Sequence, residues 1–277
     1  MGGEFVEAGG ADSYYCTAGQ WSNGLLELKG NFTQLPGAGG QGNTFDSQVA
    51  HVVKLIGSST QAIRLTNPGS SKFTKLFVMA NTDTNGLSRV SLPLGLNFPW
   101  TLYENTALGG PFVMGNVALN LNGYSLKVAG DLKHSTGTIT LNGGTAARTN
   151  PNLDITGNYL VMTSGTRNAD GTWTSVTAST GCIYSTNVGD WIRVGGEFVE
   201  AGGADSYYCT AGQWSNGLLE LKGNFTQLPG AGGQGNTFNS QGGHVLKLVG
   251  NATQAIRMSN PSSSRWNIGS PPFQRSV

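Results

Sequence analysis

Charged side chains are scarce in this sequence. Asp, Glu, Lys and Arg make up only 11% of the 277 residues, against about 25% in typical soluble domains, and the net charge is +1. The basic residues are scattered and form no stripe that could neutralise phosphates, so we expect no nucleic-acid partner. Long apolar runs are also missing, because KLFVMA and YLVM are far shorter than the roughly 20 residues of a membrane-spanning helix. We therefore expect no membrane span.

Only three histidines and three cysteines are present. His51, His134 and His244 lie far apart in the sequence, so they show neither metal-ligand spacing nor pairing with a nucleophile, and we expect them at the surface. No serine lies in a G-x-S-x-G turn, and the Gly-rich segment at 36–45 precedes no predicted helix. The sequence therefore favours a role without enzymatic activity, and an enzyme stays the alternative.

Glycine is abundant instead, with 43 residues, and one long segment occurs twice. Residues 2–48 match residues 195–241 with a single difference, Asp46 against Asn239, and a looser similarity extends the two copies to 2–73 and 195–266. Long-period self-similarity is typical of arrays in which each unit buries a face against the next. Met1 stands where Val194 stands before the second copy, so we expect the chain to be an excerpt from a longer protein.

A shorter pattern, apolar-x-apolar-x-Gly, recurs within the long one, for example as LELKG, LKVAG and IRVGG. Alternation at period two predicts a strand with one buried face, and the glycine that follows predicts a turn. Several of these strands begin 27 residues apart: Leu26 and Val53, Leu126 and Leu153, Ile192 and Leu219, Leu219 and Leu246. A repeated step of this size predicts stacked coils of two or three short strands each.

The fold predicted from these features is all-β, a right-handed parallel β-helix (β-solenoid) with coils of about 27 residues. A β-sandwich would also give many short strands, but it has no reason to repeat at a fixed step. We expect one continuous β-solenoid over residues 1–266. Residues 267–277 lack apolar alternation and are expected to be a disordered or foreign tail.

The segments LELKGNFTQ, HVVKLIGSSTQAIRLTNP, LNLNGYSLKVAGDL and LDITGNYLV resemble the tandem β-solenoid repeats of very large bacterial cell-surface and secreted proteins. The resemblance covers most of residues 1–266. It implies an extracellular or cell-surface location and a structural or adhesive role. It brings no catalytic residues with it.

The cysteines follow the same 27-residue step. Cys182 and Cys209 lie one step apart, so they should be neighbours in stacked coils, either joined by a disulfide or unbonded. Cys16 is the repeat equivalent of Cys209, and its own neighbour would precede residue 1.

Aromatic side chains are the candidates for ligand contact, because exposed rings can stack on sugar faces. The candidates are Tyr14, Tyr15, Trp21, Tyr207, Tyr208, Trp214 and Trp100. The opposing interpretation is that one ring of each adjacent pair fills the interior, and since neighbours in a strand face opposite ways, the other ring would be outside.

Oxygen-bearing side chains suggest a weaker calcium site. Asn81, Asp83 and Asn85 alternate as at the start of a calcium loop, but Leu92 stands where the bidentate Glu is required, and Asn-Gly turns are common without metal. We expect no other cofactor. The carboxylates are expected mostly on a solvated outer face, and turn residues one step apart, such as Asp131 and Asn158, are expected to form a hydrogen-bonded ladder.

The function that these expectations favour is a structural or adhesive repeat segment of an extracellular bacterial surface protein, contacting glycans and associating with itself along the solenoid axis. The alternative is a carbohydrate-active β-helix enzyme, a polysaccharide lyase or a glycoside hydrolase, which would need clustered carboxylates along one face. A flat face that binds ice or a crystalline polymer is disfavoured, because there is no regular Thr-x-Thr ladder.

Overall fold

The computed structural model of the chain describes residues 3–10, 20–67, 73–78, 90–91, 95–203 and 207–262. Within these residues the protein consists of strands and two single 3-10 turns, η1 (Ala38–Gly40) and η2 (Ala231–Gly233). All described strand pairs are parallel except β16–β17. The all-β, parallel-sheet architecture predicted from the sequence is thus confirmed. None of the helical elements in the described part is long and apolar enough to cross a membrane.

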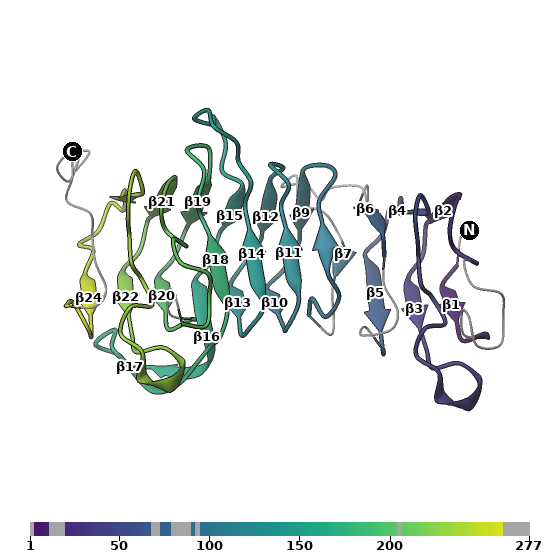
Figure 1. Cartoon of the computed structure of the whole chain (residues 1–277), viewed down its shortest axis with the longest axis horizontal. Helices are drawn as coiled ribbons and strands as arrows, with labels where there is room; N and C mark the ends of the chain where they lie inside the picture. The colour runs from purple at the N-terminus through teal and green to yellow at the C-terminus, as the bar shows by residue number, and fades with distance from the viewer. Residues whose placement is uncertain are drawn as a thin grey trace.

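Three sheets form the larger part of the molecule, and their strands follow one another along its long axis (Figure 1). Sheet 1 contains β8 (Trp100–Thr101), β11 (Ala118–Asn120), β14 (Thr138–Thr140) and β18 (Cys182–Tyr184). Sheet 2 contains β9 (Thr106–Leu108), β12 (Leu126–Val128), β15 (Leu153–Ile155), β19 (Trp191–Val194), β21 (Leu218–Leu221) and β23 (Val245–Leu248). Sheet 3 contains β10 (Phe112–Met114), β13 (Leu132–His134), β16 (Tyr159–Arg167), β20 (Phe198–Glu200), β22 (Phe225–Gln227) and β24 (Ile256–Met258), with β17 (Trp173–Ala178) paired to β16.

Two smaller sheets form the N-terminal part. Sheet 4 contains β2 (Leu25–Leu28), β4 (Val52–Leu55) and β6 (Lys75–Val78). Sheet 5 contains β1 (Phe5–Glu7), β3 (Phe32–Gln34), β5 (Gln61–Leu65) and β7 (Val90–Ser91).

The chain visits sheets 1, 2 and 3 in turn from β8 to β20 and sheets 2 and 3 from β21 to β24, and we call one such passage a circuit. The four strand pairs that the 27-residue step predicted are all register partners, as Leu126 and Leu153 show. The step is not constant, however: it is 20 residues from Thr106 to Leu126 and 39 from Leu153 to Ile192, where the β16–β17 hairpin is inserted. A parallel ladder fixes which residues face each other but leaves the length of the connection free.

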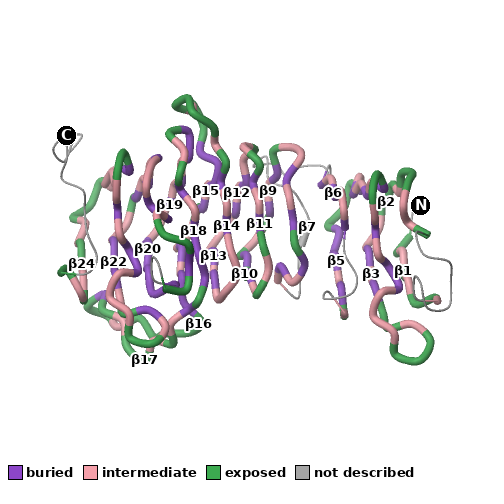
Figure 2. Tube along the Cα trace, viewed as in Figure 1, coloured by how far each residue is buried: buried purple, intermediate pink, exposed green. Residues whose placement is uncertain are grey.

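The core lies between the sheets because the strands alternate. In β21, Leu219 and Leu221 are fully buried while Glu220 between them is partly exposed. Figure 2 shows these buried stretches running along the strands. Aromatic rings stack from circuit to circuit, with ring centroids 5.7 Å apart for Phe198 and Phe225. Burying one such aliphatic or aromatic side chain contributes about 1.5–3 kcal/mol.

Glycine follows many of the strands because neighbouring circuits approach closely at the corner. A Cβ atom at Gly223 would collide with the carbonyl of Gly196 in the preceding circuit, and one at Gly196 would collide with the side chain of Asn158. The recurrent apolar-x-apolar-x-Gly pattern therefore records a steric limit of the stack.

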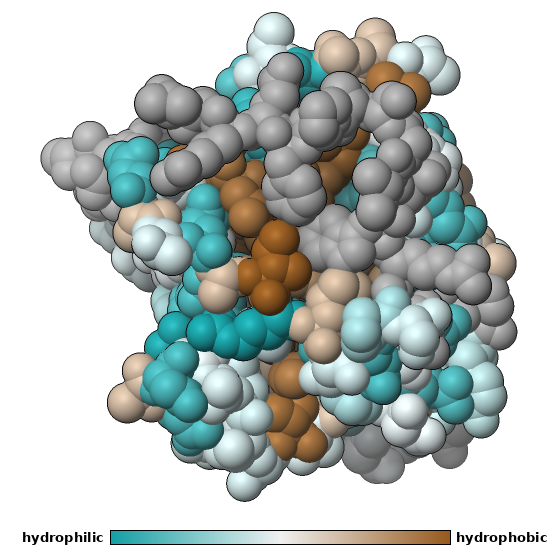
Figure 3. Space-filling model, turned by 90° about the vertical axis from the view of Figure 1, so that its left-hand side faces the viewer, coloured by the Kyte–Doolittle hydropathy of each residue, from teal (hydrophilic) through white to brown (hydrophobic). Residues whose placement is uncertain are grey.

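The two copies of the duplicated segment differ in burial although their sequences agree. Ile63 in the first copy is 3% exposed, whereas its equivalent Ile256 in the second copy is 38% exposed, because β5 pairs on both edges and β24 is the end strand of its sheet among the described strands. The end of the molecule that carries β24 accordingly shows apolar side chains between polar ones (Figure 3). Each copy is covered only on the sides where another circuit lies against it.

This difference gives a matched pair of variants. Leu219→Ala removes a fully buried side chain flanked by circuits on both sides and is expected to cost about 2–5 kcal/mol of unfolding free energy. Leu26→Ala, at the equivalent position in the end strand β2, is expected to cost clearly less, because Leu26 is already partly exposed. Urea unfolding followed by circular dichroism measures both, and equal losses would contradict the dependence on neighbouring circuits.

Candidate functional site

The exposed aromatic pair Tyr207–Tyr208 is the candidate contact site for a ligand. The two side chains are 63% and 43% exposed, and their ring centroids lie 4.7 Å apart in an edge-on arrangement. Both rings are outside, contrary to the alternation expected from the sequence, because these residues lie in a turn and not in a strand. They offer two apolar ring faces and two phenol hydroxyls at one place on the surface.

A disulfide holds this turn against sheet 1. Cys182 at the start of β18 is bonded to Cys209, which directly follows the tyrosine pair, with the two Cα atoms 5.8 Å apart. The Sγ atom of Cys182 also lies 3.8 Å from the carbonyl oxygen of Tyr208. The cross-link therefore fixes the backbone from which the two rings project.

The tryptophans proposed from the sequence serve the interior instead. Trp214 is buried and packs on Phe238 with ring centroids 5.1 Å apart, and Trp100 in β8 is buried as well. Trp21 is partly buried and packs on Phe45 in the same way as its repeat equivalent Trp214 packs on Phe238. In this structure the indoles of Trp214 and Trp100 present no face to a sugar, because they fill the space between the sheets.

Several other candidates lie outside the described residues. These are Tyr14, Tyr15, Asn81, Asp83 and Asn85. In the part of the chain that the structure describes, no group of three or more His, Cys, Asp or Glu side chains could hold a metal ion. Calcium binding by the segment around Asp83 stays a prediction.

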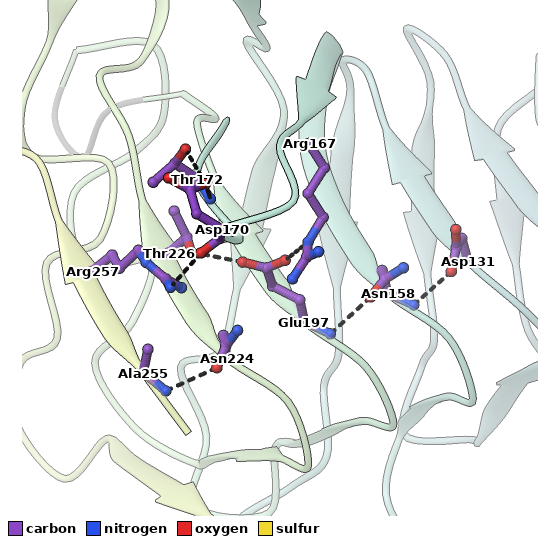
Figure 4. A network of polar contacts seen from close by, with 10 residues as sticks. All are labelled: Asp131, Asn158, Arg167, Asp170, Thr172, Glu197, Asn224, Thr226, Ala255 and Arg257. Carbon is purple, nitrogen blue, oxygen red and sulfur yellow. Dashed lines mark hydrogen bonds and ion pairs between the residues drawn. The ribbon is translucent and has the colours of Figure 1, made fainter. Parts of the chain in front are cut away.

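A ladder of turn residues connects the circuits at the edge of sheet 3 (Figure 4). Asp131 Oδ1 accepts a hydrogen bond from the backbone N–H of Asn158, at 2.7 Å, and Asn158 Oδ1 accepts one from Glu197 N–H, at 2.9 Å. Asn224 Oδ1 accepts in the same way from Ala255 N–H at 2.8 Å. These side chains therefore satisfy backbone donors of the next circuit, as the sequence pattern suggested.

Glu197 departs from the ladder and points to the β16–β17 hairpin. Its carboxylate pairs with Arg167 Nε of β16 at 2.9 Å and accepts a hydrogen bond from Thr226 Oγ1 at 2.8 Å (Figure 4). At the hairpin tip, the carbonyl oxygen of Asp170 accepts a hydrogen bond from Arg257 of β24 at 3.3 Å. No pattern in the sequence indicated that this hairpin folds back over sheet 3.

Three carboxylates expected on a solvated face are buried. Besides Glu197, these are Asp190, whose Oδ2 accepts hydrogen bonds from the N–H groups of Thr186 and Asn187, and Glu200, which is 2% exposed. Glu200 Oε1 accepts from Gly202 N–H at 2.9 Å, and its Oε2 has no hydrogen-bond partner among the described residues. Alternation in β20 could have indicated this burial, because Glu200 shares a strand face with Phe198.

The expectation of surface histidines is wrong, since all three are buried. His134 Nε2 donates to the carbonyl oxygen of Gly137 at 3.1 Å, which leaves Nδ1 to accept from the Tyr159 hydroxyl at 3.3 Å. His244 Nδ1 lies 3.1 Å from Ser240 Oγ. Each histidine lies two residues from an apolar side chain of the alternating pattern, Leu132 for His134, Val53 for His51 and Leu246 for His244, and that alternation was the overlooked signal.

Burial displaces the pKa values of these groups. It raises the pKa of Glu200 well above its usual range, and burial together with the charge of Glu200 raises the pKa of Tyr159. It lowers the pKa of His134 to about 4 and that of His244 to about 3. Both histidines are therefore neutral near pH 7, and the stability they contribute is lost as the pH falls from about 6.5 toward these values.

No protein-family model matches the chain, and no curated protein or solved structure matches it.

The disulfide is expected to stabilise the turn that carries the tyrosine pair. Cys182 and Cys209 close a loop with a sequence separation of 27, so the double variant Cys182→Ser/Cys209→Ser should lose about 3.5 kcal/mol of unfolding free energy. Urea unfolding without reductant measures this loss. Reduction of the unaltered chain should reproduce it, and reduction of the variant should change nothing further. A variant as stable as the oxidised chain would contradict the assignment.

Glu200 should make stability fall with rising pH. Its folded-state pKa is raised, so the unfolded chain ionises first as the pH rises above about 4.5, and stability declines up to the folded pKa. Glu200→Gln should therefore raise the melting temperature at pH 7 by about 3 °C or more, and the gain should vanish near pH 4. Glu7→Gln, at the partly exposed repeat equivalent, is the matched control and should raise the melting temperature at pH 7 clearly less, because Glu7 stays in contact with water. A gain of equal size at every pH would contradict a titrating Glu200.

Proposed function

We propose that this chain is a structural or adhesive segment of an extracellular bacterial surface protein, built as a right-handed parallel β-solenoid that contacts glycans through Tyr207 and Tyr208. The observation that carries the proposal is the duplication within one stack: equivalent residues such as Ile63 and Ile256 are buried to the extent that another circuit covers them. A unit of this kind gains its core from its neighbours, which is the property of an array. The right-handed sense is proposed because connections between parallel strands of one sheet are almost always right-handed.

The disulfide supports the proposed location. Disulfides persist in oxidising surroundings and are rare where cellular reductants are present. The bond between Cys182 and Cys209 joins adjacent circuits and so stabilises the stack itself.

The carboxylates support a structural role over catalysis. A lyase or glycosidase needs carboxylates that can reach the substrate. Glu197 is instead buried against Arg167 and Thr226, and Asp154 forms an ion pair with Arg193 at 2.7 Å. These groups hold circuits and the hairpin in place.

The tyrosine pair supports glycan contact. Its rings are exposed, and the disulfide fixes the turn that carries them, so little conformational entropy is lost when a ligand orders them. Phenol rings combine an apolar face with a hydroxyl, which matches the mixed apolar and polar faces of a sugar.

A glycan array tests this contact. The unaltered chain is expected to bind at least one class of glycan, and Tyr207→Ala/Tyr208→Ala should weaken that binding about tenfold or more, because covering one aromatic ring contributes on the order of 1–2 kcal/mol. Tyr124→Ala, at an exposed tyrosine away from the pair in sequence, is the matched control and should retain binding. If the unaltered chain binds no glycan, the adhesive part of the proposal is wrong and a structural segment remains.

A further inference from the structure

The outer face of sheet 3 is covered by the β16–β17 hairpin in the second copy. Val199 of β20 is 0% exposed there, and it belongs to a small apolar cluster separate from the main core. The hairpin contributes Met162, Trp173 and Val176 to this cluster, and Leu228 packs against it. The hairpin thus makes a second, outer hydrophobic layer.

Charged groups fix the hairpin in position at two points. Arg167 pairs with Glu197 at 2.9 Å, and Arg257 donates to the carbonyl oxygen of Asp170 at 3.3 Å (Figure 4). Glu197 pairs with Arg167, and Arg257 donates to the hairpin tip instead of to this glutamate.

The first copy carries the same outer face, and no hairpin covers it among the described residues. Its residues Glu4, Val6, Thr33, Leu35 and Arg64 are identical to Glu197, Val199, Thr226, Leu228 and Arg257 of the second copy. Val6 is 50% exposed and Leu35 37% exposed.

The arginine of this uncovered face has a different partner from its equivalent in the covered face. Arg64 lies 3.8 Å from Glu4, which also accepts a hydrogen bond from Thr33 Oγ1 at 2.6 Å. In the covered face the arginine of the hairpin takes the position at the glutamate. Arg64 of the surface thus lies beside Glu4 where, in the second copy, Arg167 of the hairpin pairs with Glu197. Both the apolar and the charged parts of a hairpin-binding surface are therefore present in the first copy.

We propose that the face formed by Glu4, Val6, Thr33, Leu35 and Arg64 binds a β-hairpin of the β16–β17 type, presented by another copy of this repeat. The hairpin of the chain itself is already bound to the second copy, so the occupant belongs to a different copy. This inference rests on the proposed stacking, because the strand equivalent to β16 must first pair with the outer edge of β1.

The register of that pairing follows from the second copy. Tyr159, Leu160 and Val161 of β16 pair with Phe198, Val199 and Glu200. Their equivalents in the added copy should face Phe5, Val6 and Glu7 of β1, which is the end strand of sheet 5 among the described strands. Once this pairing forms, the hairpin leaves the end of its first strand directly above Val6 and Leu35.

An extended chain tests the proposal. In it, an added copy of residues 95–194 is joined directly to residues 2–277, so that the copied Val194 stands in the place of Met1. Val6→Asp is then compared in the 277-residue chain and in the extended chain. In the former the aspartate stays accessible to water and the melting temperature should change little. In the latter Val6 is covered by the added hairpin, and the same substitution should lower the melting temperature by about 5 °C or more.

Two controls separate this inference from the proposed function. Val199→Asp places a charge under the existing hairpin and should be costly in both chains. Hydrogen exchange at the Val6 amide of the extended chain reports whether the added strand pairs with β1, because Phe5 N–H already donates to the carbonyl oxygen of Asn31 and the next N–H faces the open edge. If this amide is protected while Val6→Asp stays harmless in the extended chain, stacking holds and hairpin binding is wrong. If the amide exchanges as fast as in the 277-residue chain, both proposals are wrong.

Discussion

Backbone hydrogen bonds between parallel strands, one circuit apart, determine the other features of this protein. They fix which residues face each other, as Leu126 faces Leu153, while they leave the length of each connection free. Side chains of one kind are therefore brought together from circuit to circuit, whether phenylalanines in the core or asparagines at the turns. The glycines at the corners and the buried Cys182–Cys209 pair follow from the same close approach.

Polar side chains at the turns have a consistent role in this arrangement. Asp131, Asn158 and Asn224 accept backbone N–H groups that the parallel ladder leaves unpaired at the turns. Such bonds are favourable because an unpaired buried donor costs about 1–3 kcal/mol. Glu200 is the exception, since only one of its oxygens has a hydrogen-bond partner among the described residues, and its raised pKa reflects that position.

The sequence predicted the strands and their register because alternation and the 27-residue step are direct consequences of the ladder. It did not predict the 20- and 39-residue steps, since no backbone rule fixes the length of a connection. The histidines and Glu200 were misplaced because residue type was given more weight than strand face. The tyrosine pair was assigned to a strand, although its exposure depends on a turn held by a disulfide that sequence spacing left open. The hairpin could not be foreseen, because its binding surface consists of residues that lie in several circuits.

The β16–β17 hairpin has a mechanical consequence. Bonds between stacked circuits run along the long axis of the molecule, so a pulling force along that axis would separate the circuits one ladder at a time. The hairpin leaves one circuit and reaches Glu197 before β20 and Arg257 in β24, so it crosses these ladders as a strap. Tension along that axis would have to break the contacts of the hairpin together with the ladders that it crosses, so the circuits that this strap spans should separate last.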